Sequence, residues 1–351
     1  MNQNVIEQLG LSEADTARAR RLHDEAIVFD ASSVVYRKHQ TLPIRWDRYA
    51  AGGVTATNHT VTDPDIGLAE ALSQINDCRR WIDANQDRVM LCLSAEDIRT
   101  AKATGRGGIV FGPQDTAFLE KDLGRVGTFY DLGIRIMQLT YQTRNTVGDG
   151  CGEPSPAGLT AFGREVVREM DAIGMMVDVS HTSHETSFDA IEVASGPVVL
   201  THAHPARLTP HIRAKSDDLL RAIADTGGVI GLTTLSTFVA LEGRPGRPGV
   251  KDYLAHVEYL LDLVGPDHVG IGSDLDESAS EAEIMALPYQ EFVATWIGPY
   301  GWEGHLVADL TEAVELPNVT AGLVSLGLDD ATILKILGGN WMRVFERATG
   351  R

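Results

Sequence analysis

The sequence contains few cysteines and no long apolar run, and each of these absences excludes a class of protein. Its three cysteines, Cys78, Cys92 and Cys151, form no CxxC pair. This excludes a disulfide framework or a cysteine zinc knuckle and favours a reducing compartment. No segment approaches the ~18 apolar residues that span a bilayer, and residues 1–22 are polar and charged, unlike a signal peptide. We therefore expect a soluble, cytoplasmic protein without a membrane partner.

Basic residues are also scarce relative to acidic ones. Lys and Arg number 30 against 49 Asp and Glu, a formal net charge of −19 with His neutral. Nucleic acids and anionic lipids are polyanions, so this balance argues against binding to either. The 43% hydrophobic and 23% charged residues are typical of a globular chain. We expect the partner to be a small-molecule substrate.

Short apolar runs rich in Val, Ile and Leu recur along the 351 residues. Strands that are covered on both faces, as in a parallel sheet, have this composition. The candidate strands are residues 26–31, 54–61, 89–93, 108–112, 134–141, 175–180, 198–202, 229–233 and 269–274.

Amphipathic helical patterns lie between these runs, as at residues 159–173, 216–225 and 253–264. Alternation of this kind, repeated about eight times, predicts an α/β fold, a TIM-type (β/α)8 barrel. We expect a single domain over residues 1–351, with an N-terminal helical extension and C-terminal helices. Nine candidate strands leave one surplus, which we assign to residues 89–93. An open doubly wound sheet is the alternative, but no GxGxxG follows a strand to support it.

Polar residues stand at the predicted ends of several strands, where a (β/α)8 enzyme places its reacting groups. His181 and His202 each follow an apolar run directly, and Asp274 follows Gly272 and Ser273. Imidazole and carboxylate are natural ligands of zinc and similar ions. The alternatives are incidental histidines and an aspartate that caps a helix or forms a loop salt bridge.

The loop after His202 is rich in basic residues. Cationic groups beside a metal site suggest capture of a substrate carboxylate, for which the arginine fork is well shaped. We consider Arg213 equally compatible with this role and with a solvated loop, and we favour the solvated loop for Lys215.

Other notable residues have simpler interpretations. His184 and Glu185 belong to a helix start, and Cys151 is interpreted as a free structural thiol. We interpret the Trp and Met side chains as packing, residues 241–250 as a surface connection or flap, and residues 277–304 as a polar excursion. The histidines without supporting neighbours are His23, His39, His256 and His305.

Long stretches of the chain resemble the membrane (renal) dipeptidases, a branch of the amidohydrolase-like metal-dependent barrels. The matching stretches are DLGIRIMQLTY at 131–141, HVGIGSDLD at 268–276, ILGGNWMRVF at 336–345, and residues 158–183 and 197–232. The resemblance implies a (β/α)8 barrel and, in the family, a binuclear zinc centre that hydrolyses dipeptides.

The resemblance also implies roles for individual residues. His181 and His202 match two metal-binding histidines, and Arg213 matches the arginine that receives the substrate carboxylate. Asp274 matches an aspartate that serves as a metal ligand or general base.

Other positions depart from the family pattern. Ser32 and Val34 stand where the family has a His-x-Asp pair, Gln114 replaces the carboxylate that bridges the metals, and Tyr141 replaces a histidine near the substrate carbonyl. Two zinc ions carry four positive charges that acidic ligands normally offset. We therefore expect no binuclear centre but one divalent ion, zinc, held by His181, His202 and Asp274, while a site without metal stays open. Asp30 is a further candidate ligand.

These residues favour a dipeptidase-like hydrolase that cleaves an amide bond of a dipeptide or N-acyl amino acid. Asp274 would act as general base, Tyr141 or His204 would support the oxyanion, and Arg213, Gln114 and Ser32 would bind substrate. The alternatives are a metal-poor lyase or isomerase that performs an acid–base step on an amino-acid derivative, and a non-catalytic binding protein. The resemblance also makes a homodimer an expectation.

Overall fold

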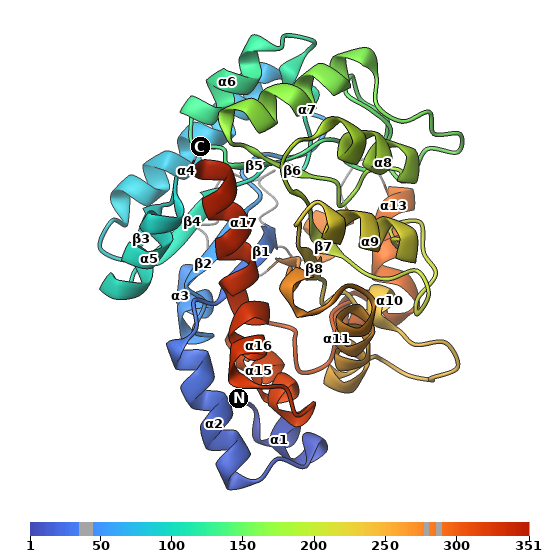
Figure 1. Cartoon of the computed structure of the whole chain (residues 1–351). Coiled ribbons are helices and arrows are strands. Elements are labelled where there is room, and N and C mark those ends of the chain that lie inside the picture. The colour runs from blue at the N-terminus through green and yellow to red at the C-terminus, as the bar shows by residue number, and fades with distance from the viewer. Residues whose placement is uncertain (35–44, 277–280, 286–289, 351) are drawn as a thin grey trace.

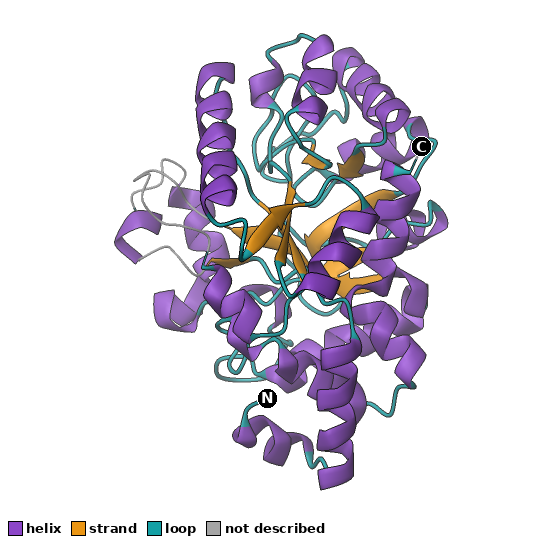
Figure 2. Ribbon diagram, turned by 90° about the vertical axis from the view of Figure 1, so that its left-hand side faces the viewer, coloured by secondary structure: helices purple, strands orange, loops and turns teal. Residues whose placement is uncertain are grey.

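Parallel strands lie at the centre of the molecule, and helices surround them, in the computed structural model (Figures 1 and 2). The structure describes residues 1–34, 45–276, 281–285 and 290–350. The strands are β1 (Phe29–Val34), β2 (Ala56–His59), β3 (Val89–Leu91), β4 (Gly107–Phe111), β5 (Ile136–Gln138), β6 (Met176–Asp178), β7 (Val198–Ala203), β8 (Ile230–Leu232), β9 (Val269–Ile271) and β10 (Leu275–Asp276).

Eight of these strands close into a barrel. Parallel pairing runs from β4 through β2, β1, β9, β8, β7 and β6 to β5. The ring is completed where Phe111, at the end of β4, forms a parallel bridge with Ile134, just before β5. Strand β3 pairs with the first half of β4, and β10 pairs with β1, so both lie outside this circuit. The predicted (β/α)8 barrel is confirmed, and residues 89–91 are the surplus strand, as expected.

The helices follow the strands in the expected alternation. Ser216 caps one of them by accepting from the backbone amide of Leu219, as its position suggests. The helices are α1 (Gln3–Leu9), α2 (Glu13–Glu25), α3 (Trp46–Ala51), α4 (Leu68–Ala84), α5 (Ala95–Thr104), α6 (Gly124–Asp131), α7 (Ala161–Ile173), α8 (His184–Val193), α9 (Asp217–Asp225), α10 (Ser236–Val239), α11 (Val250–Val264), α12 (Glu281–Ile284), α13 (Gln290–Ile297), α14 (Gly301–Gly304), α15 (Pro317–Ser325), α16 (Asp330–Leu334) and α17 (Asn340–Thr349).

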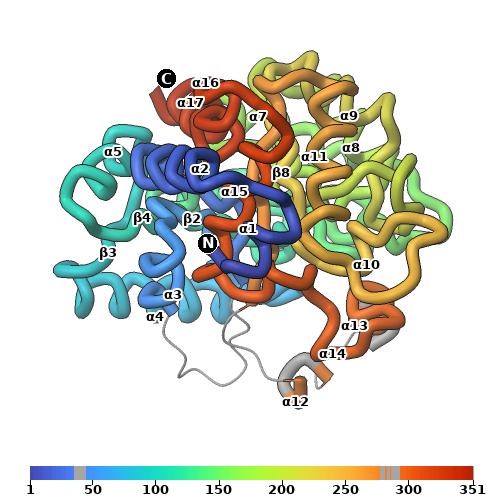
Figure 3. The backbone as a smooth tube through the Cα atoms, turned by 90° about the horizontal axis from the view of Figure 1, so that it is seen from below, coloured from blue at the N-terminus to red at the C-terminus, as the bar shows by residue number. Residues whose placement is uncertain are grey.

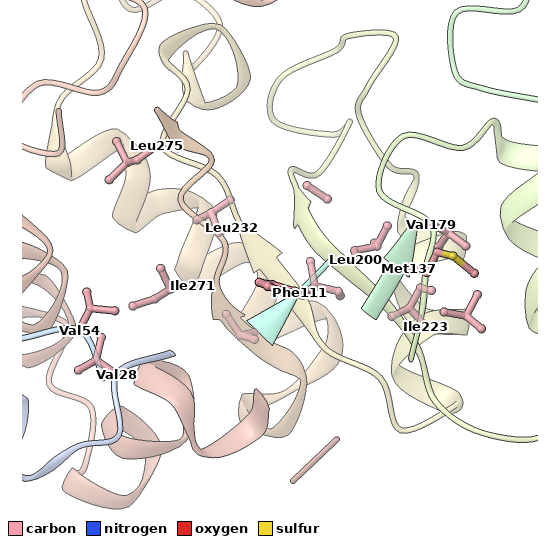
Figure 4. Close-up of a cluster of buried hydrophobic side chains, with 14 of the residues drawn as sticks. Val28, Val54, Phe111, Met137, Val179, Leu200, Ile223, Leu232, Ile271 and Leu275 are labelled. Atoms are coloured by element: carbon pink, nitrogen blue, oxygen red, sulfur yellow. The ribbon is translucent and has the colours of Figure 1, made fainter. Parts of the chain in front are cut away.

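Successive strand residues pack into two different buried clusters, as the two-residue period of a strand requires. Val28 and Leu200 belong to the larger cluster, which includes helix residues such as Ile223 of α9 (Figure 4). Their chain neighbours Phe29 and Val199 belong to a second cluster that draws residues from strands around the barrel. Residues from opposite strands can meet only inside the barrel, so the second cluster is its interior filling.

The N-terminal helices α1 and α2 lie beside α15, a helix near the C-terminal end of the chain (Figure 3). Helix α2 packs against α15, where the Nδ1 atom of His23 lies 2.7 Å from the hydroxyl of Thr320, and Arg18 pairs with Asp330 of α16. Helix α17 contributes Trp341 to the barrel-interior cluster, and its indole donates to the carbonyl of Ile271 at 3.1 Å. The expected helical extensions are present at both ends; the single-domain assignment stays a prediction.

Some elements differ from the expectation. Strand β10 follows Asp274, whose left-handed backbone (φ 60°) turns the chain after β9. Residues 277–304 include helices α12, α13 and α14, so the predicted polar excursion is partly helical. His39 lies outside the described residues. No helix in the described ranges has both the length and the apolar character needed to cross a membrane.

Candidate active site

The residues singled out at the strand ends gather at one mouth of the barrel. His181 follows β6, His202 lies in β7, and Asp274 follows β9. A pocket at this mouth is lined by residues that include Gln114, Tyr141, His181, Arg213 and Asp274. The parallel strands bring these side chains together because their carboxyl ends all meet at the same edge.

His202 is held by hydrogen bonds that fix where its ring proton sits. The hydroxyl of Thr201 donates to Oδ2 of Asp178 and lies 2.9 Å from Nδ1 of His202. Because the threonine proton is directed to the carboxylate, the hydroxyl accepts from Nδ1–H of His202. The Nε2 atom of His202 is therefore left with its lone pair. Burial, and then the Arg213 guanidinium, lower the pKa of His202 to about 3, so the ring is neutral.

His181 joins His202 to Arg213. Its Nε2 atom lies 2.8 Å from Nε2 of His202, and its Nδ1 atom lies 2.9 Å from Nη1 of Arg213. The same Nη1 atom lies 2.6 Å from Nε2 of His181. A guanidinium only donates, so the His181 ring accepts from Arg213. The ring of Tyr141 stacks on His181 with centroids 4.3 Å apart. Burial, and then Arg213, hold the pKa of His181 well below its usual range.

Asp274 is positioned by the first strand. Its amide donates to the carbonyl of Ser32 at 3.0 Å, and its Oδ1 atom accepts from the Ser32 hydroxyl at 3.0 Å. Burial raises the pKa of Asp274, while Arg213 and Ser32 act in the opposite direction. The carboxylate lies 4.0 Å from Nε2 of His202, and because that ring is neutral the contact is not an ion pair.

Asp30 does not join this group, although strand alternation suggested that it points the same way as Ser32. Its carboxylate accepts from the amide of Ser273 at 2.8 Å and from the Ser273 hydroxyl. It therefore holds the turn that carries Asp274. Burial raises the pKa of Asp30 to about 6.

Gln114 and Tyr141 form a neighbouring part of the pocket. The amide nitrogen of Gln114 donates to the Thr60 hydroxyl at 3.0 Å. The backbone amide of Tyr141 donates to the carboxylate of Asp115, which also accepts from the Asn145 side chain at 3.1 Å. Burial, and then Asp65, raise the pKa of Asp115 to about 6. Asp115 thus positions the backbone that carries Tyr141.

Two residues of the loop after β7 are not placed as the sequence suggested. Lys215 is buried and donates to the carbonyls of Val179 and Thr182, each at 3.0 Å, so the solvated interpretation is wrong. His204 is fully buried and its ring stacks on Phe238 at 4.5 Å. Among the described residues that line the pocket, Phe238 is present and His204 is not. Lys215 instead ties the loop after β7 to the segment that carries His181.

Sequence reasoning missed one wall of the pocket. Trp296, Trp302 and His305 line it, although the tryptophans were interpreted as packing and His305 as a histidine without supporting neighbours. His305 does have a neighbour, because its ring stacks on Trp302 with centroids 4.3 Å apart. Trp46 and Trp341 pack in the core as predicted, whereas Trp296 and Trp302 also line the pocket. The WEGH spacing in residues 302–305 is the only signal the sequence offered, and it is a weak one. Any two rings that stand three residues apart on a helical turn come close to each other, whether or not they line a pocket.

The donor set does not fit two metal ions. Ser32, Val34 and Gln114 offer a hydroxyl, an aliphatic group and a neutral amide. None of these side chains supplies the negative charge that two neighbouring metal ions need. As they are arranged here, no group of three or more His, Cys, Asp or Glu side chains within the described part of the chain could hold an ion. Nη1 of Arg213 lies 2.6 Å from Nε2 of His181. Arg213 therefore contacts the ring nitrogen that a metal ion would use, and His181, His202 and Asp274 do not form a metal site as they are arranged here.

A family model supports the assignment suggested by these residues. The model described as membrane dipeptidase (peptidase family M19) matches residues 6–295. The chain belongs to the membrane dipeptidase family. The expected membership is thus confirmed, and it makes the chain a metallohydrolase by family, as the sequence predicted.

Individual relatives agree with this membership. An amidohydrolase structure from Pseudomonas aeruginosa is 32% identical, with a TM-score of 0.85 over 95% of this chain and 99% of that chain. A metallopeptidase structure from Rhodobacter sphaeroides, bound to a phosphinate mimic of the dipeptide L-Ala-D-Ala, is 22% identical over 92% of this chain and 100% of that one. With a TM-score of 0.77, it shows the shared fold. Dipeptidase tcpJ of Claviceps purpurea is 27% identical over 281 residues, which are 80% of this chain and 60% of that protein. These relatives favour a hydrolase over the non-hydrolytic alternative.

Proposed function

We propose that this member of the membrane dipeptidase family hydrolyses the amide bond of a dipeptide or an N-acyl amino acid. The observation that carries the proposal is the convergence of Arg213, His181, His202 and Asp274 at the barrel mouth, three of them within hydrogen-bond distance of one another. A guanidinium receives a carboxylate, and a carboxylate whose pKa is raised can take a proton from water. Carboxylate capture and amide hydrolysis thus have their groups in one pocket.

The substrate carboxylate would bind Arg213. The guanidinium is buried and lies against His181, so a bound carboxylate would neutralise a charge that the protein leaves without an acidic partner in the contacts described. Arg213 would then turn from the imidazole to the carboxylate. Because the same contact now closes off His181, substrate binding would also free that ring.

Asp274 would act as general base on the attacking water and pass the proton to the leaving amine. Ser32 holds the carboxylate in place. We assign support of the oxyanion to Tyr141, because it lines the pocket whereas Phe238 covers His204. Gln114 would contact the substrate from the same wall as Tyr141.

We also propose a single divalent ion, zinc, at His181, His202 and Asp274. When bound, it would supply Lewis-acid polarisation of the amide carbonyl and lower the pKa of a bound water. The hydrogen bond of His202 to Thr201 supports this, since a ligating imidazole usually donates its other ring proton in this way. A cytoplasmic location and a homodimer stay predictions.

The proposal is tested by incubating the protein with zinc and a panel of dipeptides, including L,D pairs, and N-acyl amino acids, and following release of the amino acid. We expect turnover that falls by about 100-fold or more in Arg213→Ala and Asp274→Asn, a loss of roughly 3 kcal/mol of transition-state stabilisation. Arg207→Ala, a change in the same loop, should retain activity. Absence of turnover with every substrate would contradict the proposal.

A further inference from the structure

One wall of the pocket is apolar and aromatic, unlike the polar centre around His181. Its members are Leu235, Phe238, Trp296, Trp302 and His305, which we call the aromatic wall. Trp296 and Trp302 are partly exposed and line the pocket, and Trp296 also packs against the larger hydrophobic cluster. Flat rings that keep an accessible face beside a reaction centre offer a stacking surface to a ligand.

The aromatic wall is attached firmly to the barrel. Leu235 and Leu306 form an antiparallel bridge, and the amide of Ser236 donates to the carbonyl of His305 at 2.7 Å. The amide of Val307 donates to the carbonyl of Thr234 at 2.8 Å. The segment after α14 is therefore hydrogen-bonded to the segment that follows β8, and the wall has a fixed position relative to the barrel mouth.

The rings of the wall support one another and carry no charge. His305 stacks on Trp302 and meets Trp296 edge-on, with ring centroids 5.9 Å apart. Its Nδ1 atom contacts the carbonyl of Trp302. Burial, and secondarily Arg247, lower the pKa of His305, so the ring is neutral near pH 7. An uncharged slot of this kind accepts an apolar planar group without leaving a buried charge unpaired.

The wall also adjoins the carboxylate-binding residue. The guanidinium carbon of Arg213 lies 5.8 Å from the centre of the Phe238 ring, and α10, which carries Phe238, packs beside α13, which carries Trp296. A carboxylate on Arg213 brings its own α-carbon next to Phe238. The side chain on that carbon then has the aromatic wall as its nearest apolar surface.

We propose that the aromatic wall is the side-chain subsite for the substrate residue that bears the free carboxylate, and that it selects an aromatic side chain. The subsite rests on the proposed function, in which Arg213 binds the substrate carboxylate, and it specifies substrates with an aromatic residue at the carboxyl end. A phenyl or indole group would lie against Trp296 and Trp302, whereas a methyl group would leave most of that surface in contact with water.

The test measures equilibrium binding, which requires no turnover. N-acetylphenylalanine and N-acetylalanine, each as L and D forms, are titrated by calorimetry into protein kept metal-free with a chelator, so that neither compound is hydrolysed during the titration. We expect the phenyl compound to bind about tenfold or more tightly than the methyl compound, within the range by which apolar pockets discriminate. Trp302→Ala and Trp296→Ala should reduce the ratio to near one, and Trp302→Phe should retain it. Equal affinities in the unaltered protein, binding of neither compound, or a ratio unchanged by both alanine variants would overturn the subsite.

A matched control is Phe188→Ala. Phe188 is a partly exposed ring on α8, stacked edge-on with His184 and absent from the described pocket lining. This variant should keep the preference, and circular dichroism and thermal melting confirm that each variant is folded. If phenylalanine derivatives bind preferentially but no dipeptide is hydrolysed, the proposed function fails and the subsite survives. If Gly-Ala and Gly-Phe are hydrolysed with equal kcat/KM and bound equally, the subsite fails and the function survives.

Discussion

At the scale of single residues, the site depends on where hydrogen-bond protons sit. Nε2 of His202 keeps its lone pair on the side of His181, because Thr201 accepts a hydrogen bond from the other ring nitrogen and donates its own to Asp178. Nothing in the sequence distinguishes this threonine from other strand threonines. The two histidines could be predicted because each directly follows an apolar run. The group that fixes the proton could not, because it acts through a contact between β6 and β7.

Replacement of Thr201 should disturb the tautomer of His202 more than the fold. Thr201→Val keeps the shape but removes the acceptor, so Nδ1 of His202 and Oδ2 of Asp178 each lose a partner. We expect a destabilisation of about 1–3 kcal/mol and a changed distribution of protons between the ring nitrogens. Nitrogen chemical shifts of the His202 ring, together with urea unfolding, measure both. Thr201→Ser should behave as the unaltered protein, and an unchanged ring spectrum in the valine variant would refute the assignment.

Asp30 should make stability depend on pH in a defined direction. Its pKa is raised to about 6 in the fold, so the folded protein binds this proton more tightly than the unfolded chain does. The contribution of Asp30 therefore favours folding below about pH 4 and is lost as the pH rises through about 6, on the order of 3 kcal/mol. Urea unfolding between pH 4 and 7, in the presence of a chelator, follows this change.

The control for this titration is Asp30→Asn, which cannot ionise. As the pH rises from 4 to 6, the unfolding free energy of the unaltered protein should fall relative to that of Asp30→Asn. A difference that stays constant across this interval would show that Asp30 does not titrate there.

At the scale of elements, patterns that repeat along the chain could be predicted, and single irregular segments could not. The eight barrel strands were predictable from apolar runs, because a strand that is buried on both faces is apolar throughout. Helices α7, α9 and α11 were predictable from helical spacing, because a helix that is buried on one face repeats its apolar residues every three or four positions. Strand β10 is only two residues long and depends on the left-handed backbone of Asp274. Helices α13 and α14 are short and belong to no repeating pattern. Their place at the pocket depends on tertiary contacts with the segment after β8, which the sequence does not show.

Gly272 illustrates how closely the elements approach at the site. A Cβ added there would lie 1.8 Å from the carbonyl oxygen of Thr201, a backbone atom that cannot move without shifting β7. We expect Gly272→Ala to displace Asp274 and to lower the free energy of unfolding by about 1–3 kcal/mol. Urea unfolding measures the change in stability. Gly127→Ala in α6, where a Cβ would meet nothing within 4 Å, should be neutral or slightly stabilising. If the two variants had equal stability, this packing argument would fail.

At the scale of the whole molecule, the barrel explains why distant residues act together. Residues 32, 114, 181, 202 and 274 come from separate strands or the loops after them, and closure of the ring through Phe111 and Ile134 brings them to one mouth. Gln114, His181 and Asp274 line the pocket there, and Ser32 and His202 lie behind them in contact with Asp274 and His181. The sequence pattern predicted this convergence because all parallel strands end at the same edge. The aromatic wall could not be predicted in the same way, since its residues lie in loops and short helices whose path no periodicity specifies.

Two cationic side chains are buried at the site, although the chain as a whole is acidic. The chain carries a formal charge of −19, yet Arg213 and Lys215 are buried near the neutral pair His181 and His202. The carboxylates of Asp178 and Asp274 lie near the His202 ring. The Arg213 cation suits an anionic substrate, and it disfavours two further cations close to it. The expectation of at most one metal ion therefore follows from the molecule's charge arrangement as well as from the missing ligands.

The most direct test of this account is the number of divalent ions that the protein holds. The chain is purified without chelator, dialysed against a zinc-containing buffer and then against a metal-free one, and its metal content is measured by plasma mass spectrometry beside a His202→Ala variant. We predict one zinc per chain in the unaltered protein and none in the variant. Two tightly held ions per chain, or an ion that persists in His202→Ala, would contradict the account.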